Sequence, residues 1–389
     1  MQSIKKVGFY VFFPAGGIGR YSHELMKAMG AIKDVRVEVI CSPDYNWKES
    51  RQYENWDKLK PVWSPVSLKS KFRFLRGQIL NPILAIQHAK QSGFDVLHFS
   101  NVNHLTFPLW RPFLKNSSII KAISVHDVKR QQSMINEAWE EHQLKAVYNF
   151  ADLLFVHSTY QKKELIDYAK VSEDKIHVVP HGPYPHGKNG SNPERAREQW
   201  NLPTDKQIGL FFGQIRDEKN LDSLLNAMSR SGKNFHLLIA GKPWPGHNDA
   251  EYYTDIMNQL GLQEKVTFLN RYVEEQEIPS LFSAADWVAL PYKNTFTSQS
   301  GVLNVAAHYE RPILVSDAPV LKETVAENNI GVTCSSDDSN SISEGIHEII
   351  DKVNGGHQFN FDTYKQKHSW DSNARQSIAA YAETKEQML

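Results

Sequence analysis

The stretch that decides the fold is VGFYVFF at residues 7–13, which is followed by PAGGIGRY at residues 14–21. The first part is apolar and β-rich, which predicts a buried strand, and the amphipathic stretch after the second part predicts a helix. Glycines in such a turn allow backbone N–H groups to approach an anion at the helix N-terminus. The residues alone leave two interpretations open: a tight strand-to-helix turn, or a phosphate-binding loop built on Gly16, Gly17 and Gly19.

The alternation of strand and helix continues along the chain. The first series has further predicted strands at Val35–Cys41, Asp95–Phe99, Ile119–Val125, Leu153–Val156 and Ile176–Val179. A second series has predicted strands at Ile208–Phe212, His236–Ala240, Val266–Leu269, Trp287–Leu290 and Ile313–Val315. Its predicted helices are Leu221–Ser229, Glu251–Leu260, Gln276–Ala285, Val302–Tyr309 and Ser341–Val353. This βαβ rhythm predicts two doubly wound parallel sheets with helices on both faces.

A stretch rich in proline and glycine separates the two series and predicts a linker. We therefore expect an N-terminal Rossmann-like domain at residues 1–182, a linker at 183–203 and a C-terminal Rossmann-like domain at 204–371. A tail at 372–389 is expected to be helical. Ligands of open α/β sheets bind beyond the carboxyl ends of the strands, so we expect the site in a cleft between the domains.

Composition excludes several classes of protein. Lys and Arg together number 44, as do Asp and Glu, so the net charge is zero, which argues against a general nucleic-acid binder. The two cysteines, Cys41 and Cys334, exclude a disulfide framework and a Cys-rich metal site, and they fit a cytoplasmic protein. We expect no signal peptide and no membrane span, because no run approaches about 18 apolar residues.

Two further turns carry residue types suited to phosphate. In GQIRDEKN at 213–220, Arg216 and Lys219 lie three residues apart on one side of a first helical turn. A guanidinium and an ammonium can jointly neutralise a diphosphate. Cations at the start of a helix are unfavourable because they oppose the helix dipole. This cost favours a functional role for the pair over the alternative, a solvated helix start. TSQSGVLN at 297–304 is typical of a helix N-terminus whose amides suit hydroxyl or phosphate oxygens, although any helix has such caps.

Six stretches, in this order along the chain, resemble the retaining glycosyltransferases of family 4 (GT4), which have the GT-B fold. They are GGIGRYSHEL near the start, VHD at 125–127, FVHSTYQKKEL at 155–165, HVVPHGPY at 177–184, FFGQIRDEKNLDSLLNAM at 211–228 and SQSGVLNVAAHYERPILVSDAPVLKETV at 298–325. The resemblance implies two Rossmann-like domains facing a central cleft, with the C-terminal helix returning to the N-terminal domain. It also implies transfer from a nucleotide sugar with retention of configuration, without a metal ion or other cofactor.

The resemblance implies roles for individual residues. Arg216 and Lys219 match the basic pair that holds the diphosphate and stabilises the departing nucleotide. His126 matches the histidine near the transferred sugar, although a histidine hydrogen-bonded at a strand end explains it equally well. The positions that match donor-binding residues are Gly16, Gly17, Gly19, Arg216, Lys219, Arg271, Tyr272, Val273, Ser298, Gln299, Ser300, Gly301, Val302, Asn304 and Glu323. Residues 271–273 match a loop that lies against the nucleotide base, mostly through backbone.

The sequence also departs from the family pattern. Two glutamates that many members carry are replaced by Thr297 and Val305, so either Asn304 binds the ribose or the ribose is held otherwise. The arginine that often follows the glycine directly is Gln214 here. These departures resemble a branch reading GQIR and SQSG. They leave a UDP- or GDP-linked donor open, and they keep a non-catalytic nucleotide-sugar-binding protein or a sugar-nucleotide epimerase as alternatives.

The N-terminal half contains two stretches in which cations and apolar residues interleave, KSKFRFLR at 69–76 and FPLWRPFLK at 107–115. Such a surface suits an anionic membrane, and basic side chains snorkelling over a core helix are the alternative. The expected partners are a nucleotide sugar and a saccharide or lipid-linked saccharide acceptor in surface polysaccharide synthesis. Peripheral contact with the inner membrane surface stays open, and no nucleic acid is expected. Asp337 and Asp338 are expected to be solvated rather than to bind a metal.

Overall fold

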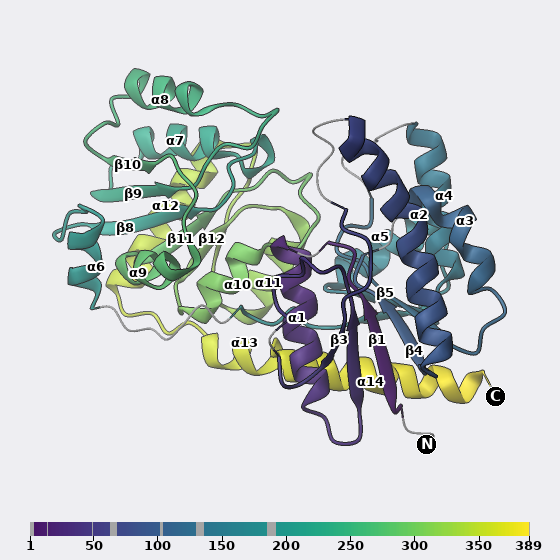
Figure 1. The fold of residues 1–389 in the computed structure, drawn as a ribbon. Coiled ribbons are helices and arrows are strands. Elements are labelled where there is room, and N and C mark those ends of the chain that lie inside the picture. The colour runs from purple at the N-terminus through teal and green to yellow at the C-terminus, as the bar shows by residue number, and fades with distance from the viewer. Residues whose placement is uncertain are drawn as a thin grey trace. The chain divides into compact units, whose positions relative to one another are not determined.

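The computed structural model describes residues 4–13, 15–48, 50–62, 68–101, 104–129, 136–184 and 192–388. The chain forms two compact units (Figure 1). Unit 1 comprises Met1–His181 together with Ser369–Leu389, and unit 2 comprises Gly182–His368. Each unit has its own parallel sheet, which we describe separately.

Unit 1 is built on a seven-stranded sheet in the order β3-β2-β1-β4-β5-β6-β7, and all neighbouring strands pair in parallel. Its strands are β1 (Lys6–Tyr10), β2 (Arg36–Ile40), β3 (Glu54–Trp56), β4 (Val96–Phe99), β5 (Ile120–Ser124), β6 (Leu153–Val156) and β7 (Ile176–Val178). Its helices are α1 (Gly16–Gly30), α2 (Leu68–Gln91), α3 (Phe107–Trp110), α4 (Glu137–Phe150), α5 (Thr159–Ala169) and α14 (Trp370–Gln387).

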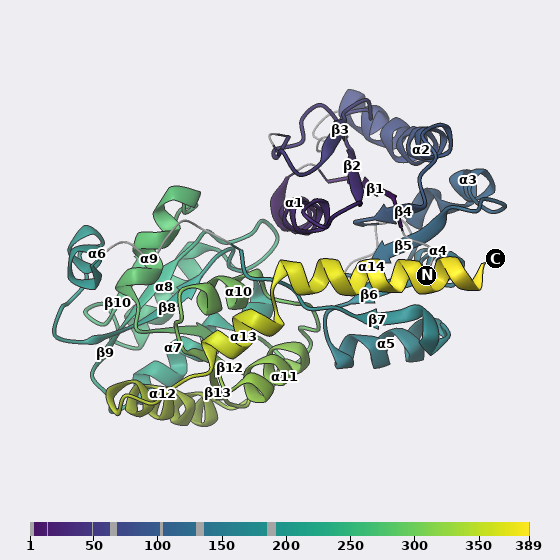
Figure 2. The same cartoon turned by 90° about the horizontal axis from the view of Figure 1, so that it is seen from below.

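Helices cover both faces of the unit 1 sheet (Figure 2). Residues of α1, such as Tyr21 and Leu25, share one apolar core with the strands and with Tyr381 of α14. Helices α2, α3, α4 and α5 contribute to a second core on the opposite face. The last helix is therefore an integral part of unit 1, and Tyr381 also hydrogen-bonds His98 within the sheet.

Unit 2 is built on a six-stranded parallel sheet in the order β10-β9-β8-β11-β12-β13. Its strands are β8 (Gln207–Phe212), β9 (Phe235–Ala240), β10 (Val266–Leu269), β11 (Trp287–Leu290), β12 (Ile313–Val315) and β13 (Gly331–Thr333). Its helices are α6 (Pro193–Gln199), α7 (Leu221–Arg230), α8 (Ala250–Gln259), α9 (Ile278–Ala284), α10 (Gly301–His308), α11 (Pro319–Asn328), α12 (Ser339–Asn354) and α13 (Phe361–Lys367). Helices α7, α8 and α12 share one core with the sheet.

The predicted fold class, two doubly wound parallel sheets, is confirmed. The structure differs where we predicted a linker at 183–203. Residues 185–191 of that stretch lie outside the described residues, but residues 193–199 form α6, which belongs to unit 2. Arg197 of α6 pairs with Asp286 at 2.7 Å and so attaches the helix to the sheet. Among the described residues, no helix combines the length and the apolar character needed to cross a membrane.

Candidate functional site

In unit 1, the glycine-rich turn after β1 leads directly into α1. Gly16 has φ +72°, a conformation that favours glycine, and a Cβ at Gly16 or Gly17 would meet no atom within 4 Å. No side chain caps this helix, and no acidic residue lies in its first turn. The first turn of α1 thus carries the positive end of the helix dipole at two glycines that have no side chain close to them, an arrangement that suits an anion. Gly19 lies further inside the helix and is buried, and Pro14 of the same motif lies outside the described residues.

His126 lies just after β5, among aromatic side chains. The edge of its ring meets Tyr21 of α1 at 4.7 Å between centroids, and its carbonyl accepts a hydrogen bond from Gln161 at 3.0 Å. Its Nε2 is buried and has no hydrogen-bond partner among the described residues. Burial, and next the charge of His181, lower the pKa of His126 to about 4. The imidazole is therefore neutral near pH 7, with one nitrogen left for a ligand.

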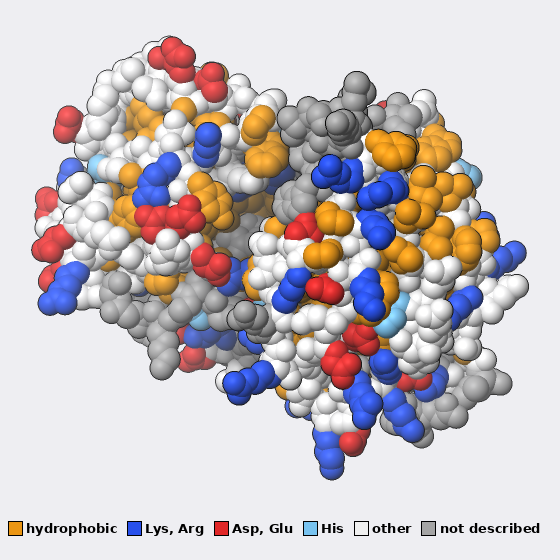
Figure 3. Space-filling model, viewed as in Figure 1, with side chains coloured by type: hydrophobic (Ala, Val, Ile, Leu, Met, Phe, Trp, Pro, Cys, Tyr) orange, Lys and Arg blue, Asp and Glu red, His pale blue; other side chains and the backbone are white. Residues whose placement is uncertain are grey.

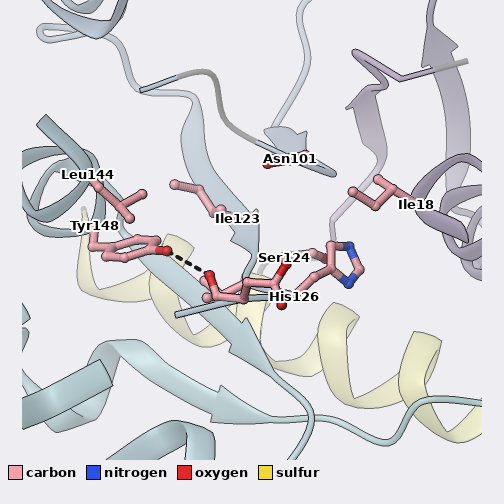
Figure 4. A pocket seen from close by; sticks show the side chains of 9 residues that line it. Ile18, Asn101, Ile123, Ser124, His126, Leu144 and Tyr148 are labelled. Atoms are coloured by element: carbon pink, nitrogen blue, oxygen red, sulfur yellow. Dashed lines mark hydrogen bonds between the residues drawn. The ribbon is translucent and has the colours of Figure 1, made fainter. Parts of the chain in front are cut away.

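A small pocket of about 40 Å³ lies beside His126 within unit 1 (Figure 4). Its lining comprises Ile18, Asn101, Ile123, Ser124, Val125, His126, Asp127, Leu144 and Tyr148. The Tyr148 hydroxyl donates to the backbone carbonyls of Asp127 and Val128, both at 3.2 Å, which fixes the loop after β5. No Lys or Arg is part of this lining, so the pocket favours uncharged hydroxyl groups over phosphate.

In unit 2, the turn after β8 holds the predicted basic pair. Gly213 has φ +98°, and a Cβ there would lie 3.4 Å from the Lys219 Nζ, so the absence of a side chain makes room for this ammonium. Burial, and next the Arg216 guanidinium, lower the pKa of Lys219 to about 7, although Glu218 opposes the shift. Arg216 forms an ion pair with Glu218 at 2.9 Å. The turn thus holds two cations, of which Arg216 is paired with Glu218, and a bound anion would stabilise the charged form of Lys219.

The predicted serine-rich turn forms the start of α10. Ser300 is the N-cap residue but its side chain makes no capping hydrogen bond, and the first turn has no acidic residue. Val302 lies close to Gly213, because a Cβ on that glycine would approach Val302 Cγ2 to 3.5 Å. The amides near Ser298, Gln299 and Gly301 and the basic turn after β8 therefore belong to one edge of the unit 2 sheet. Glu323 lies on α11 and is half-buried.

Asn304 does not fit the role of ribose ligand that its sequence position predicts. Its side chain has no exposed surface, and its Oδ1 accepts a hydrogen bond from Tyr364 of α13 at 3.0 Å. Val305 beside it is a core residue. The side chain of Asn304 joins α10 to α13, so we correct its assignment from donor binding to a structural contact.

The predicted base-binding loop at 271–273 is held by its own arginine. Both terminal nitrogens of Arg271 contact the Glu277 carboxylate at 2.8 Å, and one of them also donates to the Tyr272 carbonyl. Arg271 is thus engaged within the protein. Tyr272 and Val273, by contrast, border a pocket of about 320 Å³ at the ends of β8 and β9.

Sequence reasoning missed most of the lining of this pocket. It comprises residues 212–214, 240–245, 272, 273 and 278, and includes the largely exposed rings of Trp244 and Tyr272. The stretch KPWPG at 242–246, directly after a strand, could have indicated this pocket. Its prolines and glycine predict a loop, and a tryptophan is seldom left exposed to solvent in a loop. Among the described residues, no group of three or more His, Cys, Asp or Glu side chains is placed to hold a metal ion.

Two family models match the chain, one in each half. The model described as Glycosyltransferase Family 4 matches residues 15–183, and that described as Glycosyl transferases group 1 matches residues 192–377. A curated relative, D-inositol 3-phosphate glycosyltransferase from Mycolicibacterium smegmatis, is 26% identical over 61% of this chain and 54% of its own length. Other curated relatives are likewise matched over little more than half of their length.

Solved structures share the fold over nearly the whole chain. A sucrose-phosphate synthase from Thermosynechococcus elongatus aligns with TM-score 0.73 and 18% identity, covering 97% of this chain and 98% of its own. HepE from Anabaena, in complex with UDP-glucose, aligns with TM-score 0.65 and 16% identity, covering 98% of each chain. The two family models match one half of the chain each and together well over half of it, so this chain belongs to glycosyltransferase family 4, with the GT-B fold.

Proposed function

We propose that this chain transfers a hexose-type sugar from a UDP- or GDP-linked donor to a hydroxyl of a saccharide or lipid-linked saccharide acceptor. The observation that carries the proposal is the buried Lys219 and the half-buried Arg216, which lie beside the N-terminus of α10. Positive charge held in a poorly solvated turn stabilises the charge that develops on a departing nucleoside diphosphate. Sugar binding alone does not require such leaving-group stabilisation, so the arrangement supports an enzyme over a non-catalytic binder.

In the proposed reaction, the bond between the anomeric carbon and the donor phosphate oxygen breaks with its electron pair on the oxygen. A bond forms between the anomeric carbon and the acceptor oxygen on the same face, so configuration is retained. The acceptor proton passes to the leaving phosphate. His126, whose pKa is lowered to about 4, is a poor base near pH 7 and serves better as a hydrogen-bonding group for a sugar hydroxyl.

We propose that the base of the donor occupies the 320 Å³ pocket in unit 2, against Trp244 and Tyr272. Its apolar walls and exposed rings offer stacking surfaces, which every base can use. HepE has the same fold and was solved with UDP-glucose, so UDP-glucose is the first donor to test. In unit 1, the pocket beside His126, whose lining has no Lys or Arg, supports an uncharged saccharide hydroxyl as the acceptor group.

The test is a thermal-shift panel of UDP, GDP, ADP and dTDP compounds with EDTA present. A ligand that binds only the native state raises the melting temperature. We expect one nucleotide to stabilise the wild type, and Arg216→Ala/Lys219→Ala to lose about 1,000-fold in affinity, because two charge-assisted contacts are removed. Arg195→Ala/Lys265→Ala, which removes two exposed cations of the same unit, is the control. Stabilisation by none of the nucleotides would refute the proposed donor site.

We further propose that unit 1 touches an anionic membrane at the cytoplasmic face, as a lipid-linked acceptor requires. Exposed hydrophobic side chains gather over α2 and α3 (Figure 3). They are Phe72, Leu75, Leu80 and Leu109, with Phe113 directly after α3. Exposed cations, namely Arg73, Arg76, Arg111 and Lys115, lie among them in sequence. Apolar side chains bordered by cations are complementary to a surface of anionic lipid. The side chains of Lys69, Ser70 and Lys71 lie outside the described residues.

Flotation with vesicles tests the membrane contact. We expect binding to vesicles that contain anionic lipid, weaker binding to neutral ones, and loss of binding in Arg73→Glu/Arg76→Glu. The charge-matched control Arg195→Glu/Lys265→Glu should float like the wild type. Equal flotation of the two double variants, or no flotation of the wild type, would refute this surface.

A further inference from the structure

Tyr292 is a large buried side chain at the edge of the basic turn, and neither the family resemblance nor the sequence pattern points to it. It follows β11 by two residues and is 1% exposed. Its hydroxyl is buried, and the side chain of Ser300, the N-cap residue of α10, is its polar neighbour.

The ring of Tyr292 lies against Lys219. The Nζ of Lys219 is 5.6 Å from the ring centroid, and on another side it borders Gly213, where a Cβ would lie 3.4 Å away. Lys219 is only 6% exposed, and no ion pair or hydrogen bond joins its Nζ to another described residue. A buried ammonium without a partner is unfavourable in itself, and an aromatic face is one of the few surfaces that attract it.

The backbone on both sides of these residues is tied together. Directly before Lys219, the carbonyl of Glu218 accepts a hydrogen bond from the Lys293 amide at 2.9 Å. Directly after it, the Asn220 side chain donates to the Pro291 carbonyl at 3.0 Å. The neighbours of Lys219 are thus bonded to the neighbours of Tyr292. This reciprocal pairing fixes the ring and the ammonium in one register.

Two more contacts hold Tyr292 itself. Its carbonyl accepts a hydrogen bond from the Ser316 hydroxyl, and its ring meets Phe296 edge-on, with 4.9 Å between centroids. Asn220 also donates to the Ser336 carbonyl at 3.0 Å, which anchors the Lys219 side of the pair. The Tyr292 ring is therefore held rigidly, and its contact restricts the conformations of the flexible Lys219 side chain.

We propose that Tyr292 is a positioning residue: its ring holds the Lys219 ammonium where the donor diphosphate binds. Without the ring, the long lysine side chain would sample several rotamers, and binding would have to restrict them. The inference rests on the proposed function, because it assumes that Lys219 meets a diphosphate. It adds Tyr292 to the proposed donor site as a residue that affects donor binding through the side chain of Lys219.

A double-mutant cycle on nucleotide affinity tests the proposal, with UDP and GDP as probes in calorimetry. Lys219→Ala is expected to weaken binding at least tenfold, and Tyr292→Leu roughly tenfold. The double variant is expected to bind no more weakly than Lys219→Ala alone, because Tyr292 has no effect once the ammonium is gone. Tyr292→Phe keeps the ring and should lose less than threefold.

The melting temperature of each variant checks that it is folded. A merely structural role for Tyr292 would weaken binding equally in the presence and absence of Lys219, so independent losses in the double variant would overturn the proposal. Tyr292→Leu with wild-type affinity, or Tyr292→Phe as weak as Tyr292→Leu, would also overturn it. A wild type that binds neither UDP nor GDP would instead remove the proposed donor site, and this inference with it.

Discussion

In unit 1 three buried histidines and the half-buried His126 lie in or just after the strands β4 to β7, whereas in unit 2 the turn after β8 buries a lysine beside an arginine. His98 lies in β4, and His126, His157 and His181 follow β5, β6 and β7. Burial lowers the pKa of His98 and His157 to about 3 and that of His126 to about 4, so these rings stay neutral. Lys219, with a pKa of about 7, stays partly charged.

This difference teaches how one type of sheet serves two kinds of ligand. Neutral imidazoles can donate or accept hydrogen bonds to sugar hydroxyls without attracting a phosphate. An ammonium and a guanidinium attract phosphate from solution and become more favourable when it arrives. Because both sheets have the same backbone architecture, their selectivity depends on which side chains are buried there and in which charge state.

Among the effects that compare the two units, the largest is expected from His126, in the histidine cluster of unit 1. His126→Ala should lower turnover by about 100-fold, as the removal of one preorganised hydrogen-bonding group does elsewhere, while the Kd for UDP or GDP stays within twofold. Steady-state rates and calorimetry measure the two quantities. His142→Ala, at an exposed position of α4, is the control. Unchanged turnover would remove His126 from the reaction, and weakened nucleotide binding would contradict the division between the units.

The next effect concerns stability. An imidazole whose pKa is lower in the folded than in the unfolded protein binds protons mainly after unfolding, so stability is lost as the pH falls below about 6.5. His98, with a pKa of about 3, should account for about 2 kcal/mol of the loss in unfolding free energy between pH 7 and pH 5. His98→Phe preserves the stack on Phe9 and should reduce this pH dependence in denaturant titrations.

His142→Phe is the matched control for His98, because its side chain is exposed, and it should keep the wild-type pH dependence. A His98→Phe protein that loses as much stability between pH 7 and pH 5 as the wild type would show that this ring does not stay neutral.

A smaller effect separates the apolar pocket of unit 2 from its basic turn. Trp244→Ala should weaken UDP or GDP binding about tenfold, the usual contribution of one base-stacking ring, and leave pyrophosphate affinity unchanged. Trp139→Ala, which removes a 39% exposed ring in unit 1, serves as the control. Equal losses for the nucleotide and for pyrophosphate would place the base elsewhere.

The smallest effect concerns the pH dependence of nucleotide binding at Lys219, in the basic turn of unit 2. If the protonated form of Lys219 binds the diphosphate, affinity is retained below pH 7 and falls about fivefold between pH 7 and pH 8. Lys219→Arg keeps its charge in this range, so its affinity should stay flat. Calorimetry in buffers of different ionisation enthalpy would detect the proton taken up by the wild type. A flat wild-type curve would show that Lys219 is fully protonated before the ligand arrives.

The sequence predicted both sheets because buried parallel strands are apolar runs separated by amphipathic helices. It did not predict β3, because Glu54–Trp56 is a short edge strand with polar residues. It placed α6 in a linker because Pro193 looked like a breaker, although proline is well tolerated in the first turn of a helix.

The candidate site was predictable only where a linear motif exists. The motif at 213–220 located Arg216 and Lys219, and β8 with its following turn places them together. Asn304 was assigned wrongly because its position in the motif does not reveal Tyr364, which lies sixty residues further on and occupies its side chain. Tyr292 and Trp244 are single aromatic residues after strands, and their sequence neighbourhoods do not indicate the lysine or the pocket that they meet in space.

The return of α14 to unit 1 has a consequence for biosynthesis. Residues 370–387 leave the ribosome after the whole of unit 2, yet Tyr381 completes the core that α1 begins. A nascent chain can therefore finish its second unit while its first still lacks a helix and exposes the apolar face of α1 to chaperones. A premature stop codon within residues 370–387 would accordingly damage unit 1, most of which was made first.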